Sequence, residues 1–309
     1  MIKIKKSVIL AVSILMMPIA ALSQAVTFLN ISPDAATQAM GGASVASEAN
    51  AFALYNNPAA IALSEDKFAI GASYNMWQSA AETTNNLVTI STFLKTGDKF
   101  GIAAAYRSFE KPSYQVYDAN GNDKGDYTPK DMALDLGFSY AVIENLSVGL
   151  TFKYISSSLS DSATGSCVSA DLGATYLLGK ATIAASYTNM FGTMTYDEVG
   201  YSLPAAFKVG ASYSLSESTQ HSCKVNLQAN YLTEESALGV AVGGEYGFKE
   251  AVFVRLGYYN SCDETVASSY LSAGLGVEFA KVSLDCSYLV GGDSSPVGGS
   301  MNIGLGYRF

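Results

Sequence analysis

The feature that most constrains this chain is an alternation of apolar and polar residues with a period of two, which runs from residue 67 to the last residue. In the final segment Ile303, Leu305 and Tyr307 fall on one face, and Asn302 and Arg308 fall on the other. Successive side chains of a β-strand point to opposite sides, so this pattern is typical of strands with one apolar face. The chain is therefore predicted to be all-β from residue 67 onward.

Fourteen segments show this pattern. They lie near residues 67–77, 86–95, 99–109, 131–142, 146–156, 167–178, 181–190, 204–214, 223–232, 237–248, 251–260, 269–279, 281–290 and 300–309. Fourteen is an even number, as in single-chain bacterial barrels, and most segments have about the 9–11 residues that a tilted strand needs to cross a membrane. A soluble sandwich would also alternate, with its apolar faces turned inward. We predict a 14-stranded antiparallel transmembrane β-barrel in the outer membrane.

Charged residues support this assignment because each strand can be placed with its charges on the face opposite the apolar one. The predicted lumen-lining charges are Arg107, Asp135, Lys153, Asp171, Lys208, Glu245, Arg255, Glu278 and Asp285. A Lys or Arg on the lipid face at the midplane would cost about 2–4 kcal/mol. Tyr residues such as Tyr74, Tyr140 and Tyr288 fall toward strand ends on the apolar face, as in an interfacial aromatic girdle. Outer-membrane lipid and lipopolysaccharide are the predicted surroundings.

The first 23 residues have the form of a secretory signal peptide. Lys3, Lys5 and Lys6 precede an apolar run from residue 8 to residue 22, and small residues lie at the −3 and −1 positions before Gln24. The alternative, a retained helical anchor, is disfavoured because the run is shorter than the ~20 residues of a bilayer span.

The connections alternate between short turns and longer segments, notably 110–130, 157–166, 191–203, 260–268 and 291–299, with the segment 215–222 as an exception among the turns. Bacterial barrels keep short turns in the periplasm and long loops outside. The outer loops are acidic, which fits simple solvation, a docking rim for a basic partner, or lipopolysaccharide bridged by divalent ions. The terminal Tyr307 and Phe309 resemble the C-terminal signal that barrel-assembly machinery recognises.

Residues 24–66 do not alternate and are rich in Ala, Ser and Asn. Short helices and a Pro-bearing turn are expected there, with small residues that permit close packing. Fourteen strands enclose more space than their own side chains fill, so this segment is predicted to be an N-terminal plug. A periplasmic tail is the alternative.

Within this segment the residues resemble a known family. Pro33 and Asp34, then Gly41 and Gly42, then the turn Asn57-Pro58-Ala59 are similar to the N-terminal region of the PorV/PorQ family of Bacteroidetes outer-membrane proteins, itself part of the FadL-like barrel class. An Arg that often follows Pro-Asp in PorV-like chains is absent here. The resemblance implies type IX secretion components or cargo as partners, or, on the FadL side, uptake of a hydrophobic ligand.

Other activities find little support in the sequence. The single histidine, His221, falls in a polar turn, and no nucleophile motif accompanies it, so no catalytic site is predicted. Cys167, Cys223, Cys262 and Cys286 lack metal-ligand spacing, and no metal or cofactor is predicted. A disulfide stays open, as does a weak calcium-loop pattern that begins at Asp118. The formal net charge of −9 disfavours nucleic-acid binding.

Overall fold

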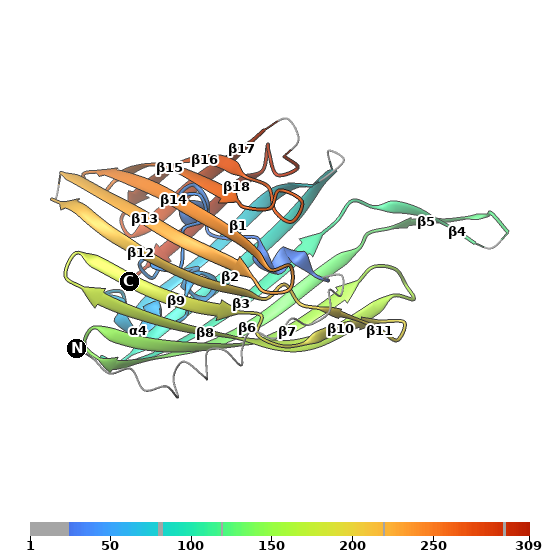
Figure 1. Cartoon of the computed structure of the whole chain (residues 1–309), viewed down its shortest axis with the longest axis horizontal. Coiled ribbons are helices and arrows are strands. Elements are labelled where there is room, and N and C mark those ends of the chain that lie inside the picture. Colours follow the sequence, from blue (N-terminus) through green and yellow to red (C-terminus); the bar gives the residue numbers. More distant parts are fainter. Residues whose placement is uncertain (1–24, 80–82, 119, 219, 293–294) are drawn as a thin grey trace.

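The computed structural model describes residues 25–79, 83–118, 120–218, 220–292 and 295–309. The predicted signal peptide, residues 1–23, lies outside them. Fourteen antiparallel strands form a closed barrel (Figure 1), as predicted. The barrel strands are β1 (Phe68–Ser79), β2 (Thr83–Thr96), β3 (Phe100–Glu110), β6 (Lys130–Ile143), β7 (Leu146–Ser158), β8 (Thr164–Leu178), β9 (Ala181–Thr188), β12 (Ala206–Glu217), β13 (His221–Leu232), β14 (Ala237–Phe248), β15 (Val252–Ser261), β16 (Tyr270–Phe279), β17 (Val282–Gly291) and β18 (Met301–Arg308).

Each barrel strand pairs with its neighbours in the chain order, and the first strand closes the barrel against the last. The closing register pairs Ala69 with Arg308 and Met76 with Met301. We call the end of the barrel with the short connections the turn end, and the opposite end the loop end. By the usual orientation of outer-membrane barrels the turn end faces the periplasm.

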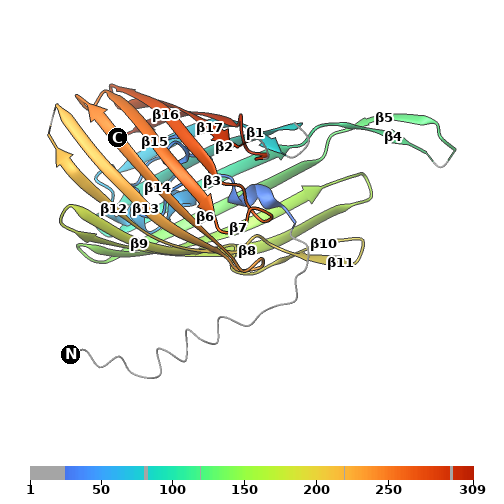
Figure 2. The same cartoon turned by 45° about the horizontal axis from the view of Figure 1, so that its top comes forward.

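Two of the predicted longer loops contain additional strands. Residues 110–130 hold a hairpin of β4 (Tyr114–Tyr117) and β5 (Asp123–Tyr127), and residues 191–203 hold β10 (Thr193–Tyr196) and β11 (Val199–Ser202). The β4–β5 hairpin projects well beyond the barrel in both views (Figures 1 and 2). These strands have four or five residues each, which is too short for the period-two pattern to stand out.

The segment 215–222 is not the long exception that the sequence suggested. β12 continues to residue 217 and β13 begins at His221, and the N–H of Ser218 donates to the carbonyl of His221 over 3.1 Å. Polar residues at the ends of both strands conceal the pairing, because a strand that leaves the membrane no longer needs an apolar face. His221 is therefore a strand residue.

The outer surface of the barrel is apolar. In β6, Leu134, Leu136 and Phe138 are exposed, while Asp135 and Gly137 between them are buried. The separation of apolar and charged faces predicted from the sequence holds along this strand. No helix in the described part of the chain is long and apolar enough to cross a membrane.

The N-terminal segment lies inside the barrel, and we call residues 25–66 the plug. It contains η1 (Thr27–Asn30), α2 (Ala35–Gln38), α3 (Ala53–Asn56) and α4 (Ala60–Leu63). Helix α2 contacts β16, β17 and β18, whereas α4 contacts β2, β3, β6 and β7, so the plug spans the lumen from wall to wall.

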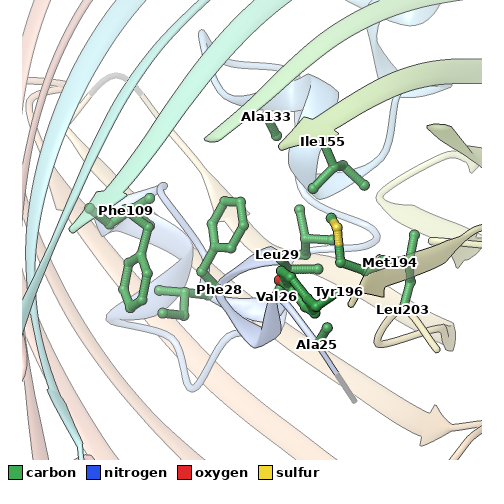
Figure 3. Packing of buried hydrophobic residues seen from close by; sticks show 12 residues of the cluster. Ala25, Val26, Phe28, Leu29, Phe109, Ala133, Ile155, Met194, Tyr196 and Leu203 are labelled. Atoms are coloured by element: carbon green, nitrogen blue, oxygen red, sulfur yellow. The ribbon is translucent and has the colours of Figure 1, made fainter. Parts of the chain in front are cut away.

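Two apolar clusters hold the plug. Near the loop end, Phe28 and Leu29 of η1 pack with Phe109, Ile155 and the β10 residue Met194 (Figure 3). A second cluster joins residues of α3 and α4 to wall residues of β1, β2 and β3; its members include Phe52, Leu54, Ile61, Ala69, Phe93 and Ala103. Burial of these side chains removes apolar surface from water, which is the main favourable contribution to docking.

Candidate functional site

Glycines in the barrel wall receive the plug. A Cβ on Gly149 would lie 2.4 Å from the amide nitrogen of Ala59, and one on Gly257 would lie 2.1 Å from that of Gly41. Glycines with equally close plug neighbours also occur at Gly71, Gly101, Gly137, Gly173, Gly210, Gly243 and Gly274. Glycine in a strand interior often marks the close approach of another backbone. Strand periodicity alone does not reveal this role.

Asp34 is the polar centre of the plug. It caps α2, where its Oδ1 accepts from the amide of Ala36 over 3.0 Å. Its Oδ2 accepts from the side-chain amides of Asn50 at 2.8 Å and Asn56 at 2.7 Å. A buried carboxylate is stable only when its oxygens are satisfied in this way. Asp34 thus ties three plug segments together, and Pro33 before it contributes its carbonyl to Asn302 of the wall over 3.1 Å.

Gly41 and Gly42 form the turn that follows α2. Their φ angles are +72° and +77°, a region that glycine adopts without strain. A Cβ on Gly41 would also lie 2.7 Å from the carbonyl oxygen of Tyr258. The amide of Gly41 donates to Ser272 Oγ over 2.8 Å. Both the turn and its seat against β15 and β16 therefore require glycine at position 41.

The Asn57-Pro58-Ala59 turn docks on the opposite wall. Asn57 Oδ1 accepts from the amide of Ala59 over 3.1 Å, and Asn57 Nδ2 donates to the carbonyl of Val45 and to Thr175 Oγ1, both at 3.1 Å. Asn57 is extended (φ −167°), as expected for a residue before proline. Its side chain closes the turn and links two parts of the plug to β8.

The predicted lumen charges form two groups. The first, near the turn end, is built on Arg255, whose Nε lies 2.6 Å from Glu245 and whose Nη1 lies 2.6 Å from Asp285. We call Glu245, Arg255 and Asp285 the turn-end cluster. Nearby, Glu278 pairs with Arg308 at 2.6 Å.

The second group lies nearer the loop end, and we call Arg107, Asp135, Lys153, Asp171 and Lys208 the loop-end cluster. Arg107 lies 3.7 Å from Asp135, with both side chains buried. Lys153 lies 2.7 Å from Asp171. Arg107 also holds the plug, because its guanidinium lies 4.4 Å from the ring centre of Tyr55 and donates to the carbonyl of Leu29 over 3.3 Å.

A cavity of about 1000 Å³ lies between the plug, the loop-end cluster and the outer loops. Its lining includes Arg107, Lys153, Asp171 and Lys208 from the wall, the plug residues Leu29, Ile31 and Gln38, and loop residues of 264–269 and 295–297. It has the size of a large small-molecule site. Both apolar and polar groups face it.

Wall residues that the sequence analysis did not single out hold the plug backbone. Gln228 Oε1 accepts from the amides of Ser44 at 2.9 Å and Val45 at 2.7 Å, and Asn226 Nδ2 donates to the carbonyl of Ala43 over 3.0 Å. The sequence feature that could have indicated this role is the presence of Asn and Gln at the lumen-facing positions of the strand. Long amides on the lumen face can satisfy backbone groups that short helices leave open.

The remaining predicted residues lie outside the lumen site. Phe309 pairs with the start of β1, since the amides of Lys67 and Phe68 donate to its carbonyl at 2.8 and 2.9 Å, and Tyr307 faces outward beside it in β18. His221 Nδ1 lies 2.7 Å from the hydroxyl of Tyr246 at the turn end. Cys167, Cys223, Cys262 and Cys286 are not bridged.

The tip that starts at Asp118 is a hydrogen-bonded turn of the β4–β5 hairpin. Asp118 Oδ1 accepts from the amides of Asn120 at 2.8 Å and Asn122 at 2.9 Å, and Oδ2 accepts from the Asn122 side chain over 2.9 Å. These hydrogen bonds lower the pKa of Asp118, and the bond from the Asn122 side chain has the largest effect. The carboxylate is thus engaged within the turn itself.

A closed fourteen-stranded barrel with a helical plug that spans its lumen defines a FadL-like outer-membrane barrel protein. The model of the family "Type IX secretion system protein PorV" matches residues 18–233, well over half of the chain. The chain belongs to this PorV family, as the residues of the plug suggested. No curated protein sequence matches it.

Solved structures agree on the fold. The CymD monoaromatic hydrocarbon channel superposes with a TM-score of 0.60 at 14% identity, covering 92% of this chain and 99% of its own. The toluene transporter TodX of Pseudomonas putida gives 0.60 at 14%, covering 89% and 97%. A Pseudomonas aeruginosa FadL homologue gives 0.52 at 12%, covering 90% and 96%. At this identity the likeness extends to the fold alone.

Proposed function

We propose that this protein serves type IX secretion as a plugged barrel that binds protein partners at the loop end, either secretion components or their cargo. The family match supports a role in this system. The observation that carries the partner-binding part is the β4–β5 hairpin, which extends beyond all other loops (Figure 2).

The hairpin has the properties of a protein-binding element. Most of its described residues are exposed, including Tyr117, and its two strands pair only with each other. Open strand edges can add a strand from a partner, and exposed tyrosines are common at interfaces. The base is anchored, because the hydroxyl of Tyr114 donates to the carbonyl of Leu159 over 2.8 Å. An anchored hairpin presents its binding surface in a fixed direction.

The test is to replace residues 113–128 with a short Gly-Ser linker in the tagged full-length protein. We expect loss of co-purifying secretion-system proteins from gently solubilised membranes, and loss of surface cargo. As a control, the loop 233–236 is replaced in the same way. The proposal fails if the hairpin variant, folded and inserted, retains both its partners and its cargo.

A second candidate function, uptake of hydrophobic small molecules, is favoured by the cavity described above and by the fold that this chain shares with the CymD monoaromatic hydrocarbon channel and the toluene transporter TodX. Measured permeation of a solute through the purified protein in liposomes would support it. Partner capture with no permeation would favour the secretion role.

We infer further that the protein carries out no catalysis. His221, which could act as a base, lies beside Tyr246 and Phe248 at the turn end, outside the lumen. The lumen carboxylates Asp171 and Asp285 are engaged by Lys153 and Arg255, respectively.

A further inference from the structure

Lys208 differs from the other cations of the loop-end cluster. It faces the lumen from β12, opposite Ser186 on one side and Asn230 on the other, and it lines the cavity. Its side chain is partly buried, yet among the described residues no ion pair or hydrogen bond engages its Nζ. The cluster therefore includes a lysine without a partner.

The nearby carboxylates are already occupied. Asp171 Oδ2 lies 2.7 Å from Lys153 Nζ, and Asp171 Oδ1 accepts from the amide of Asn189 over 2.7 Å. Asp135 is the partner of Arg107. The loop-end cluster thus holds three cations and two carboxylates, which leaves one positive charge that is not balanced within it.

A partly buried charge without a counter-charge is unfavourable, and an anion that reaches it gains from the interaction. The cavity gives such an anion room, and at about 1000 Å³ it lies at the upper end of the range for small-molecule sites. Polar groups of Gln38, Asn230 and Tyr259 also line the cavity. These groups suit a ligand with hydroxyl or amide groups better than an alkyl chain.

We propose that the cavity binds a small polar organic anion, whose carboxylate or phosphoryl group pairs with Lys208. The inference does not depend on the partners of the outer loops. It also sets this chain apart from a simple hydrocarbon path, because an uncharged apolar molecule would leave the surplus charge unbalanced.

The sequence supplies a reporter for the test. Trp77, the only tryptophan of the chain, lines the cavity, so its fluorescence responds to occupancy. The purified full-length protein is titrated with glucuronate, with glucose 6-phosphate and, as the neutral analogue of similar size, with glucose. We expect a saturable change with at least one of the anions and none with glucose; the anion that responds identifies the acidic group.

Variants connect this response to Lys208. Lys208→Gln should weaken binding of the responding anion about tenfold or more, which is the effect of losing one charged contact, whereas Lys208→Arg should retain it. The matched control is Lys111→Gln, since Lys111 also lines the cavity but is paired with Asp131 at 3.1 Å. Its effect should be less than about twofold. Heat-modifiable migration on gels confirms that each variant is folded.

Several outcomes would overturn the proposal. These are an equal response to glucose and to the anions, unchanged binding by folded Lys208→Gln, or no response to either anion up to about 100 mM, the range of very weak binding. Saturable binding of octanoate with no response to glucuronate or glucose 6-phosphate would also overturn it, and would indicate an amphiphile site instead.

Discussion

The plug packs against the barrel wall in different ways at the two ends of the lumen. Toward the turn end the wall carries glycines such as Gly101 and Gly149, and the plug packs directly against their backbone. Toward the loop end the wall carries long side chains such as Arg107, Lys153 and Lys208, and a cavity remains between them and the plug. The plug thus packs closely against the wall toward the turn end, whereas a cavity remains toward the loop end.

The charges follow the same division. In the turn-end cluster Arg255 contacts two carboxylates at 2.6 Å each, so its charge is fully engaged. In the loop-end cluster Lys208 has no partner among the described residues, although two ion pairs lie beside it. The comparison teaches that ionic contacts at the turn end serve stability, whereas those at the loop end leave a charge available to a ligand.

The largest expected effect comes from removing the central cation of the turn-end cluster. Arg255→Met should lower the free energy of unfolding by about 3 kcal/mol, because Glu245 and Asp285 are then left partly buried without a counter-charge. Lys208→Met, the matched change at the loop end, should cost less than about 1 kcal/mol because no contact is lost. Denaturant titration of both variants in detergent measures the difference.

Equal losses in these two variants would mean that the two clusters do not differ in the way described. As an internal check, Arg255→Met combined with Glu245→Gln and Asp285→Asn should regain part of the stability, because no unpaired charge then remains.

A smaller loss is expected when the polar centre of the plug is removed. Asp34→Ala deletes the cap of α2 and the acceptor for Asn50 and Asn56, each a hydrogen bond to a charged group. We expect about 2 to 3 kcal/mol of destabilisation and a rise in ion conductance through planar bilayers as the plug loosens. Asn56→Ala, which removes one of these bonds, should produce a smaller rise. A wild-type conductance in Asp34→Ala would contradict this role.

Two adjacent glycines provide a test of the contact between the plug and the barrel wall. A Cβ on Gly243 would lie 2.4 Å from Met40 of the plug, whereas one on Gly244 would have its nearest neighbour at 3.9 Å. Gly243→Val should therefore cost about 1 to 3 kcal/mol through overpacking, and Gly244→Val should be close to neutral. The thermal midpoints of the two variants provide the measurement, and a loss that is the same for both would refute the proposed plug contact.

The barrel could be predicted because the same local requirement applies to every strand. Each strand that crosses the membrane must place apolar residues at alternate positions, as Leu134, Leu136 and Phe138 do, so the pattern is present in the sequence itself. The hairpins β4–β5 and β10–β11 lie outside this constraint, and their four- and five-residue strands are too short for the pattern to stand out. The strand ends around His221 were obscured for the same reason.

The site was predictable only in its residue types. Alternation puts Arg255 and Lys208 on the lumen face, but it does not show that Arg255 is paired and Lys208 is not. The partner Asp285 lies 30 residues from Arg255 and pairs with it across two strand boundaries. The same holds for Gly257, whose meeting with Gly41 depends on where the plug docks. Contacts between plug and wall arise from tertiary packing, which strand periodicity does not encode.

The smallest expected effect concerns Asp118, a carboxylate outside the lumen. The prediction compares the contribution to stability of hydrogen bonds exposed to water with that of the hydrogen bonds in the plug. Bonds from Asn122, with smaller contributions from Asn120, lower the pKa of Asp118 in the hairpin tip. Because the pKa of Asp118 is lower in the ordered tip than in the unfolded chain, ionisation of Asp118 stabilises the ordered tip at pH values above the usual pKa range of aspartate. This stabilisation is lost as the pH falls through the lowered pKa.

The amide resonance of Asn122 should therefore shift in acid, in an NMR titration, while the barrel stays folded. Asp118→Asn should abolish that shift and leave the thermal midpoint unchanged, unlike Asp34→Ala, because residues 120–122 of the tip are exposed. The control is Asp161→Asn in another exposed loop, which should leave the Asn122 shift intact; a shift that persists in Asp118→Asn would assign the titration to another group.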